Sequence, residues 1–256
     1  MQSRAPWAKP GGVISFLSAR VPPPYSLRPI SIAIRSFLAL AAAAVLAAVP
    51  ASPTRAAHEI PGAGLGFVVH RGDSPIGTHR ISFARSGDEL AVETITDIAV
   101  RIAFITVYRY SQTVRQTWRT GRLQSLDART DDNGEVRTLR VRPGPDGLVV
   151  DGPSGRRVVA LDIHPTGYWN RDIVGRTQLL DVGDGDILTI AAQPAGARTL
   201  KLDDRLVEAQ LYRFTGDITA EAGYSPEGEW VSLLLITRGN EIKYVREPAV
   251  PLRNAR

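Results

Sequence analysis

An alternating segment, residues 92–104, constrains the fold of this chain more than any other feature. One parity holds apolar and threonine side chains, namely Val92, Thr94, Thr96, Ile98, Val100, Ile102 and Phe104. The other parity includes the charged residues Glu93, Asp97 and Arg101. Because side chains of a β-strand alternate between the two faces of a sheet, this period of two predicts a long strand with one buried face. From Ala103 to Tyr108 both parities turn apolar, which predicts a strand buried on both sides.

Short extended runs separated by turn residues make up most of the remaining chain. A hairpin is expected over residues 66–83, and further strands near residues 115–126, 135–141, 148–150, 157–162, 187–192, 199–202, 206–216, 230–237 and 241–245. Only residues 167–180 could hold a short helix. Strands at this spacing without helical crossovers predict an all-β fold: a single antiparallel curved sheet or (half-)barrel domain with at most one short helix.

The first part of the chain is typical of an export leader. Arg28 and Arg35 precede an unbroken apolar run, Ser36–Val49, and small residues follow it. We therefore predict that residues 1–57 are a disordered N-terminal extension plus a secretory signal peptide, cleaved near Ala51 or Ala57, and that residues 58–256 form one antiparallel β domain. The run is too short for a comfortable membrane span, so we expect a periplasmic protein with no stable span after cleavage; a retained N-terminal anchor is the alternative. Residues 1–27 fit no part of a signal, which indicates a start upstream of the true one or an unusually long leader.

Charge and cysteine usage exclude several functions. The chain has no Cys, which rules out disulfides, thiol catalysis, Cys zinc sites and Fe–S clusters. The formal charge of +5 lies entirely in residues 1–51, and the remainder holds 26 basic and 26 acidic side chains. We therefore expect no nucleic-acid partner.

Searches for catalytic and metal motifs lead to no assignment. The chain contains no G-x-S-x-G, H-E-x-x-H, P-loop or dinucleotide fingerprint, so we predict no catalytic residue and no cofactor. His70 and His79 would face each other if the first hairpin closed through residues 73–76, but two imidazoles lack the third ligand of a catalytic zinc site, and we predict no metal. Residues 181–186 resemble a calcium loop with Gly at ligand positions and are expected to form a tight acidic turn. Residues 130–135 contain Asn133-Gly134, which predicts a hairpin turn.

Aromatic residues give the clearest indication of a binding site. Core packing is one explanation for them; an apolar pocket with a few polar groups is the other. On the second explanation the pocket is lined by Tyr108, Tyr110, Trp118, Tyr168 and Trp169. Its polar groups are His79, Asn133 and Asn170.

Six short motifs carry a family resemblance. In chain order they are Gly72-x-x-Pro75-Ile76-Gly77-Thr78-His79, Thr106-Val107-Tyr108-Arg109-Tyr110, Trp118-x-x-Gly121-Arg122-Leu123, Thr130-Asp131-Asp132-Asn133-Gly134, Pro165-x-x-Tyr168-Trp169-Asn170 and Gly228-x-Trp230-Val231. From about Gly66 to Tyr244 the chain resembles the uncharacterised bacterial domain-of-unknown-function family 6134, which implies an exported β protein without assigned chemistry. A looser similarity is to family 3108 and to the LolA-like half-barrels that carry lipoproteins and lipids. Two positions depart from the family pattern: Gln116 stands where an acid is expected and Gly223 where an aromatic residue is expected.

Three functions remain open. The first is a non-catalytic periplasmic protein that binds an apolar or amphipathic, lipid-like ligand in its curved sheet. The second is an interaction module of the cell envelope without a small ligand, whose protein partner the sequence does not identify. The third is an envelope hydrolase that uses His79 with Asp131 or Asp132. Whether the protein is an enzyme stays undecided, and the missing nucleophile motif favours a non-catalytic role.

Overall fold

A computed structural model describes residues 64–202, 205–237 and 239–247; the expected leader and its cleavage sites lie outside them. The first eight strands are β1 (Leu65–Arg71), β2 (Ser74–Ser86), β3 (Glu89–Ile102), β4 (Ile105–Arg119), β5 (Arg122–Asp132), β6 (Glu135–Pro143), β7 (Leu148–Gly152) and β8 (Gly155–Val159). The remaining elements are β9 (His164–Pro165), the 3₁₀ helix η1 (Arg171–Gly175), β10 (Gln178–Leu180), β11 (Ile187–Leu202), β12 (Arg205–Gly216), β13 (Thr219–Tyr224), β14 (Trp230–Thr237) and β15 (Asn240–Arg246). Within the described ranges, no helix is long and apolar enough to cross a bilayer.

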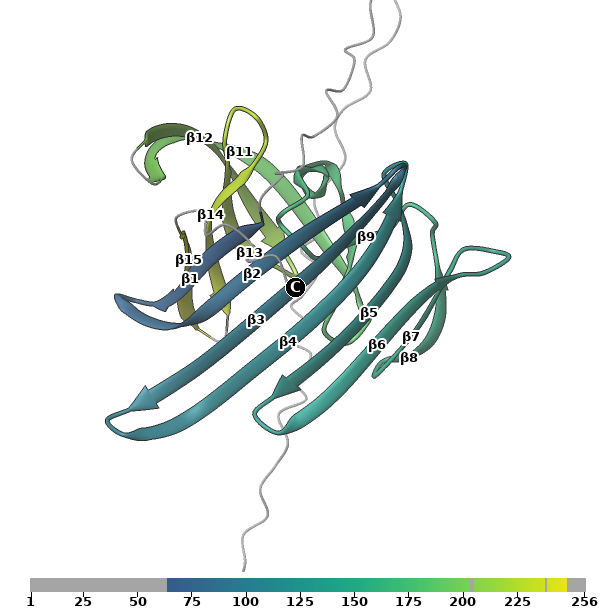
Figure 1. Ribbon diagram of the computed structural model, residues 1–256, viewed down its shortest axis with the longest axis horizontal. Helices are drawn as coiled ribbons and strands as arrows, with labels where there is room; N and C mark the ends of the chain where they lie inside the picture. Colours follow the sequence, from purple (N-terminus) through teal and green to yellow (C-terminus); the bar gives the residue numbers. More distant parts are fainter. Residues whose placement is uncertain (1–63, 203–204, 238, 248–256) are drawn as a thin grey trace, which may run out of the picture. The chain divides into compact units, whose positions relative to one another are not determined.

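The strands form one curved sheet (Figure 1). Its order is β8-β7-β6-β5-β4-β3-β2-β1-β15-β14-β13-β12-β11-β10-β9, so β1 pairs with β15 and joins the two halves of the meander. Neighbouring strands are antiparallel except β9 and β10, which are parallel. The prediction of an all-β antiparallel fold with at most one short helix is therefore confirmed, with η1 inside the segment expected to hold the helix.

The alternation predicted for residues 92–104 is present in β3 as far as Asp97; residues 98–100 are all half-buried, and Ile102, expected on the buried parity, is 67% exposed. Val92, Thr94 and Thr96 are buried, whereas Ile95 and Asp97 are exposed. The opposing strand β4 has the same pattern, because its residues from Tyr108 to Trp118 on the same parity face inward. The inner face of the sheet is therefore defined by a period of two on both long strands.

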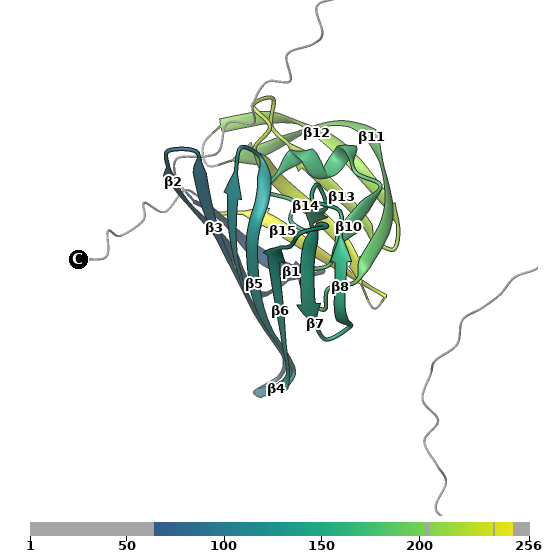
Figure 2. The same ribbon diagram turned by 90° about the vertical axis from the view of Figure 1, so that its right-hand side faces the viewer.

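The two edges of the sheet approach each other on the far side (Figure 2). Ser154 N in the β7–β8 turn donates to Asp184 O after β10 at 3.3 Å. Arg157 of β8 forms an ion pair with Asp186 at 3.2 Å. One buried apolar cluster contains side chains from β5–β7 and from β10–β14. The curved sheet is thus closed into a barrel-like body by these turn contacts and by a shared core.

Two local expectations differ from the structure. Residues 103–108 are not buried on both sides, because the chain turns at Ala103 (φ 52°) and Phe104 is fully exposed at the β3–β4 tip. The first hairpin closes through a tighter turn than residues 73–76, so His79 pairs with Phe67 and His70 pairs with Pro75. The two histidines therefore do not face each other.

Candidate ligand-binding cavity

A polar row crosses the inner face of four neighbouring strands. The register aligns His79 with Thr96, Thr96 with Gln112, and Gln112 with Thr130. A hydrogen bond of 2.7 Å joins His79 Nδ1 and Thr96 Oγ1, and Gln112 Nε2 donates to Thr130 Oγ1 at 2.9 Å. This row lines a cavity of about 500 Å³ inside the barrel.

His79 connects the polar row to an aromatic wall on the strands that follow β2 in the sheet, namely β1, β15 and β14. Its ring centroid lies 5.5 Å from that of Trp230, 5.3 Å from that of Tyr244 and 6.2 Å from that of Phe67. Burial disfavours the imidazolium and lowers the pKa of His79 to about 4, so the ring is neutral at pH 7. Burial likewise raises the pKa of Tyr244 to about 12. The cavity wall is therefore rich in neutral polar and aromatic groups.

The segment between β9 and η1 inserts two aromatic side chains into the barrel. The Tyr168 ring lies 5.8 Å from Trp230 and 5.5 Å from Phe214 between centroids. Trp169 contacts Trp118 edge to face at 5.8 Å. Tyr168 and Trp169 line the cavity, while Trp118 lies behind them in the closed core.

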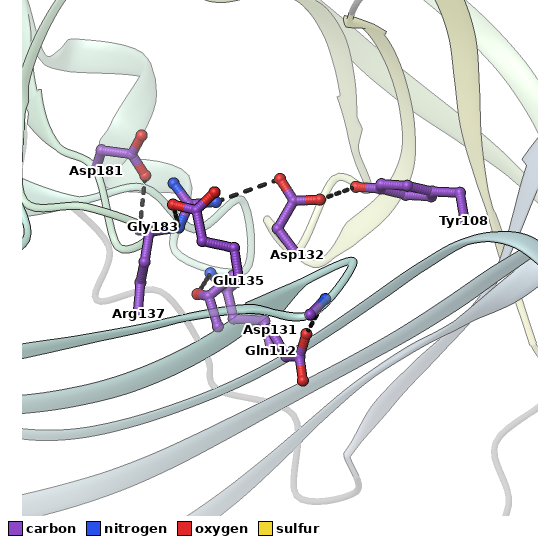
Figure 3. A network of polar contacts seen from close by, with 10 residues as sticks. Tyr108, Gln112, Asp131, Asp132, Glu135, Arg137, Asp181 and Gly183 are labelled. Atoms are coloured by element: carbon purple, nitrogen blue, oxygen red, sulfur yellow. Dashed lines mark hydrogen bonds and ion pairs between the residues drawn. The ribbon is translucent and has the colours of Figure 1, made fainter.

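A charged network lies at one side of the cavity (Figure 3). Tyr108 Oη donates to Asp132 Oδ1 at 2.7 Å, and Arg137 contacts Asp132 Oδ2 at 3.3 Å. Asp181 accepts a hydrogen bond from Gly183 N at 2.8 Å. Burial is the largest influence on Asp181 and raises its pKa, while the Gly183 amide and Arg137 oppose that shift. Arg137 and Asp132 are thus paired charges on a partly solvated wall.

A second cavity of about 420 Å³ shares lining residues with the first, at Tyr110, Asp132, Leu235, Thr237 and Tyr244. Its other walls are mostly apolar: Ile76, Ile98, Val100, Val107 and Ile242 contribute to them. The hairpin end of the barrel therefore carries an apolar hollow that adjoins the polar row.

A larger hollow of about 800 Å³ lies on the outer side of β4–β7. Its lining includes exposed charged residues that already form ion pairs, such as Arg115 with Glu93 and Arg140 with Asp127. Exposed pairs of this kind are solvated and leave little energy for a ligand. The interior cavities are the better candidate site.

The structure places five of the eight expected binding residues at these cavities: His79, Tyr108, Tyr110, Tyr168 and Trp169. The other three have structural contacts instead. Trp118 Nε1 donates to Gln116 Oε1 at 2.8 Å within the core. Asn133 adopts φ 57° in the β5–β6 turn, where its backbone N donates to Arg109 O. Asn170 Oδ1 caps η1 by accepting from Asp172 N at 3.0 Å.

His79 is not brought together with the carboxylates expected of a hydrolase. Three inter-strand gaps separate β2 from β5, which amounts to roughly 14 Å along the sheet. Asp131 lies on the outward parity and accepts a hydrogen bond from Gly134 N at 2.8 Å. In the part of the chain that the structure describes, no three His, Asp or Glu side chains form a metal-binding group.

Sequence reasoning missed most of the polar lining, including Thr94, Thr96, Gln112, Thr130 and Arg137. The signal was available, because Thr94 and Thr96 occupy the buried parity of a strand where apolar residues are usual. The two departures from the family pattern also have local explanations. Gln116 is buried and accepts the Trp118 indole N–H. A Cβ at Gly223 would collide with Ser232 Oγ and lie 3.1 Å from Leu211 Cδ2, so this site has no room for an aromatic ring.

The fold and cavity define a barrel-like antiparallel β protein with a partly polar interior. The family model described as Domain of unknown function (DUF6134) matches residues 67–247, and the chain belongs to this family. A solved structure, the β-barrel-like protein of Domain of Unknown Function DUF1849 from Brucella abortus, is similar in fold with a TM-score of 0.52. That likeness has 10% sequence identity and covers 73% of this chain and 94% of the other. None of the curated proteins compared with the chain matches it.

Proposed function

We propose that this protein binds one amphipathic, lipid-like molecule inside its curved sheet and does so without catalysing a reaction. The observation that carries the proposal is the junction of two cavities of different polarity, about 500 and 420 Å³, which share five lining residues. Cavities of this size, mostly apolar with a few placed polar groups, are typical of small-molecule sites.

The lining divides the roles within the site. Neutral polar groups of the row, which include His79 and Gln112, would hydrogen-bond a polar ligand group. The apolar part of the ligand would contact Ile98, Val100 and Tyr108 at the hairpin end. A charged head group would meet the Arg137–Asp132 pair, so hydrogen-bond donors and acceptors on the ligand are favoured over a bare charge.

The binding test uses a cavity-filling variant and a matched surface variant of one strand. Gln112→Trp places an indole in the lumen, whereas Ser111→Trp places it on the exposed outer face of the adjacent position. The exported protein is analysed by native mass spectrometry with solvent extraction, and by displacement of the apolar fluorophore N-phenylnaphthylamine by lysophosphatidylethanolamine. We expect a stoichiometric ligand in the wild type and Ser111→Trp, and at least about tenfold weaker probe binding in Gln112→Trp. A clean apo mass after incubation with envelope lipids would refute the proposal and favour an interaction module.

We also propose a periplasmic location for this activity. The support is the basic, apolar and small-residue sequence of the leader, which includes Ser36–Val49. The mature protein from a bacterial periplasm should then begin at residue 52 or residue 58. Intact-mass measurement of the fractionated protein distinguishes this processing from a retained N-terminus.

A further inference from the structure

The tip of the β3–β4 hairpin exposes a group of large apolar side chains. Phe104 is 103% exposed, Ile105 69%, Ile102 67% and Val107 47%. The ladder register shifts between Val100 and Arg101, and beyond the shift Ile102 pairs with Ile105, so these two side chains lie on the same face of the ribbon. Phe104 lies in the turn that connects β3 and β4. Isolated exposed apolar residues are common on protein surfaces, but four within six residues at one tip form a patch of the kind that marks an interaction site.

This tip extends beyond the neighbouring strands (Figure 2). The β2–β3 ladder ends at the pair Gly77 and Ile98, and the β4–β5 ladder ends at Tyr110 and Asp132. Past these pairs, β3 and β4 form ladder pairs only with each other within the described residues. An isolated two-stranded ribbon is marginally stable in water, so a partner that surrounds the tip would stabilise it.

The charged residues of the hairpin segment itself have one sign. Residues 98–110 contain Arg101 and Arg109 and no acidic residue. Both arginines are exposed and lie at the base of the apolar tip. Arg71 of β1 lines the same surface hollow as Arg101. An apolar tip with a basic collar complements a bilayer, whose anionic head groups surround an acyl interior.

The tip is also continuous with the apolar end of the interior. Val100, Val107 and Tyr108 belong to the hairpin and line the 420 Å³ cavity. A surface that contacted the tip would therefore lie next to the mouth of the cavity. This adjacency distinguishes the tip from other exposed apolar residues such as Leu206 on β12, which is 75% exposed and does not line either interior cavity.

We propose that the β3–β4 tip docks the protein on an anionic lipid bilayer by inserting Phe104 and its apolar neighbours, with Arg101 and Arg109 at the head groups. A bilayer is favoured over a second copy of the chain because the positive charge of Arg101 and Arg109 would repel an identical tip. Docking rests on the hairpin alone. Its consequence, ligand exchange with the membrane through the mouth, rests on the proposed binding function.

The test measures sedimentation of the exported protein with vesicles of phosphatidylethanolamine and phosphatidylglycerol, and with vesicles of phosphatidylcholine. We expect Phe104→Ser/Ile105→Ser to lower the partition coefficient at least about tenfold. Arg101→Gln/Arg109→Gln, or high salt, should remove the preference for the anionic vesicles. Leu206→Ser is the matched control, and thermal unfolding checks that each variant folds.

A direct probe of insertion is Phe104→Trp. The tryptophans at positions 118, 169 and 230 are all buried, so an indole at position 104 reports the tip. Doxyl-labelled lipid should quench this indole and leave the wild-type fluorescence almost unchanged.

Three results would overturn docking: no sedimentation with anionic vesicles, no quenching of the introduced indole, or an equal loss in Leu206→Ser. Concentration-dependent dimers that Phe104→Ser abolishes would instead assign the tip to self-association. Gln112→Trp separates the two proposals, because it should weaken probe binding while vesicle sedimentation persists.

Discussion

Acidification should destabilise this protein through two buried histidines, His79 and His164. Burial is the main cause that lowers the pKa of each to about 4. An unfolded histidine has a pKa of about 6.5. Between pH 4 and pH 6.5 the unfolded chain therefore binds more protons than the folded protein. The stabilisation that comes from keeping these two histidines neutral is fully present above about pH 6.5 and is lost as the pH falls toward about 4.

The two pKa values determine the size of the effect. At pH 5, protonation favours the unfolded chain by about 2 kcal/mol for each such histidine, compared with about 0.2 kcal/mol at pH 7. If the sites are independent, the free energy of unfolding should fall by about 4 kcal/mol between pH 7 and pH 5. His164 has only 3% of its surface exposed and its Nε2 has no hydrogen-bond partner among the described residues, so burial outweighs the stabilisation that Pro165 O, 2.7 Å from Nδ1, gives the protonated ring.

Urea unfolding at pH 7, 6 and 5 measures this dependence. The raised pKa of Asp181 acts in the opposite direction, because its burial favours the protonated carboxyl as the pH falls. Asp181 is present in both the wild type and His79→Gln/His164→Gln. Its contribution therefore cancels when the pH dependence of the free energy of unfolding is compared between the two proteins. His70→Gln is the matched control, because His70 is on the opposite parity of β1 from the buried residues Phe67 and Val69. Parallel pH curves for the wild type and the double variant would refute the reasoning, whatever their difference at pH 7.

Two further substitutions test the packing of the barrel. Gly77→Ala should destabilise the fold by several kcal/mol, because a Cβ would collide with Asp97 O and lie 2.8 Å from the Cα of Ile98 in β3. Gly175→Ala is the control in thermal unfolding, because a Cβ there would meet nothing within 4 Å. Equal melting temperatures of the two variants would contradict the close approach of β2 and β3 at Gly77. Leu126→Ala, at a fully buried position, should lower the free energy of unfolding in urea by about 2–5 kcal/mol. Leu206→Ala, at a position 75% exposed, should change the same free energy by no more than about 0.5 kcal/mol. A similar loss in both variants would show that Leu126 is not a core residue.

The fold class could be predicted from the sequence because the long strands obey their period of two. Glu93, Ile95 and Asp97 alternate with buried residues, and the Asn133-Gly134 turn has positive φ at both positions. The same local rules failed at residues 103–108. In sequence, an apolar run that forms a turn looks the same as a strand buried on both faces. Only the structure distinguishes the two cases here, because the β3–β4 ladder ends at Ile102 and Ile105 and the chain turns at Ala103.

The cavity was harder to predict because it depends on contacts distant in sequence. Tyr168 and Trp169 were identified from the sequence, but the ring partner of Tyr168, Trp230, comes from β14, more than 60 positions away. The inward direction of Arg137 is also hard to read from the sequence, because acidic residues such as Asp132 and Glu135 interleave with the arginines of this segment. The closure of the sheet by Ser154 and Asp184 likewise has no local signature.

The order of side chains along β3 and β4 nevertheless encodes the cavity. From the closed end, the inward residues of β3 are Leu90, Val92, Thr94, Thr96, Ile98 and Val100. Those of β4 are Trp118, Gln116, Val114, Gln112, Tyr110 and Tyr108. The inward face of β3 thus passes from apolar to polar and back to apolar residues, whereas that of β4 alternates apolar and polar residues before it ends in two tyrosines. Burying threonine and glutamine in a dry core costs free energy unless every polar atom is paired, so a chain selected for stability alone would continue the apolar pattern. A polar band between two apolar bands instead matches a ligand with a polar group at its inner end and an apolar part toward the hairpins, and the exposed tip lies at the same end as that apolar part.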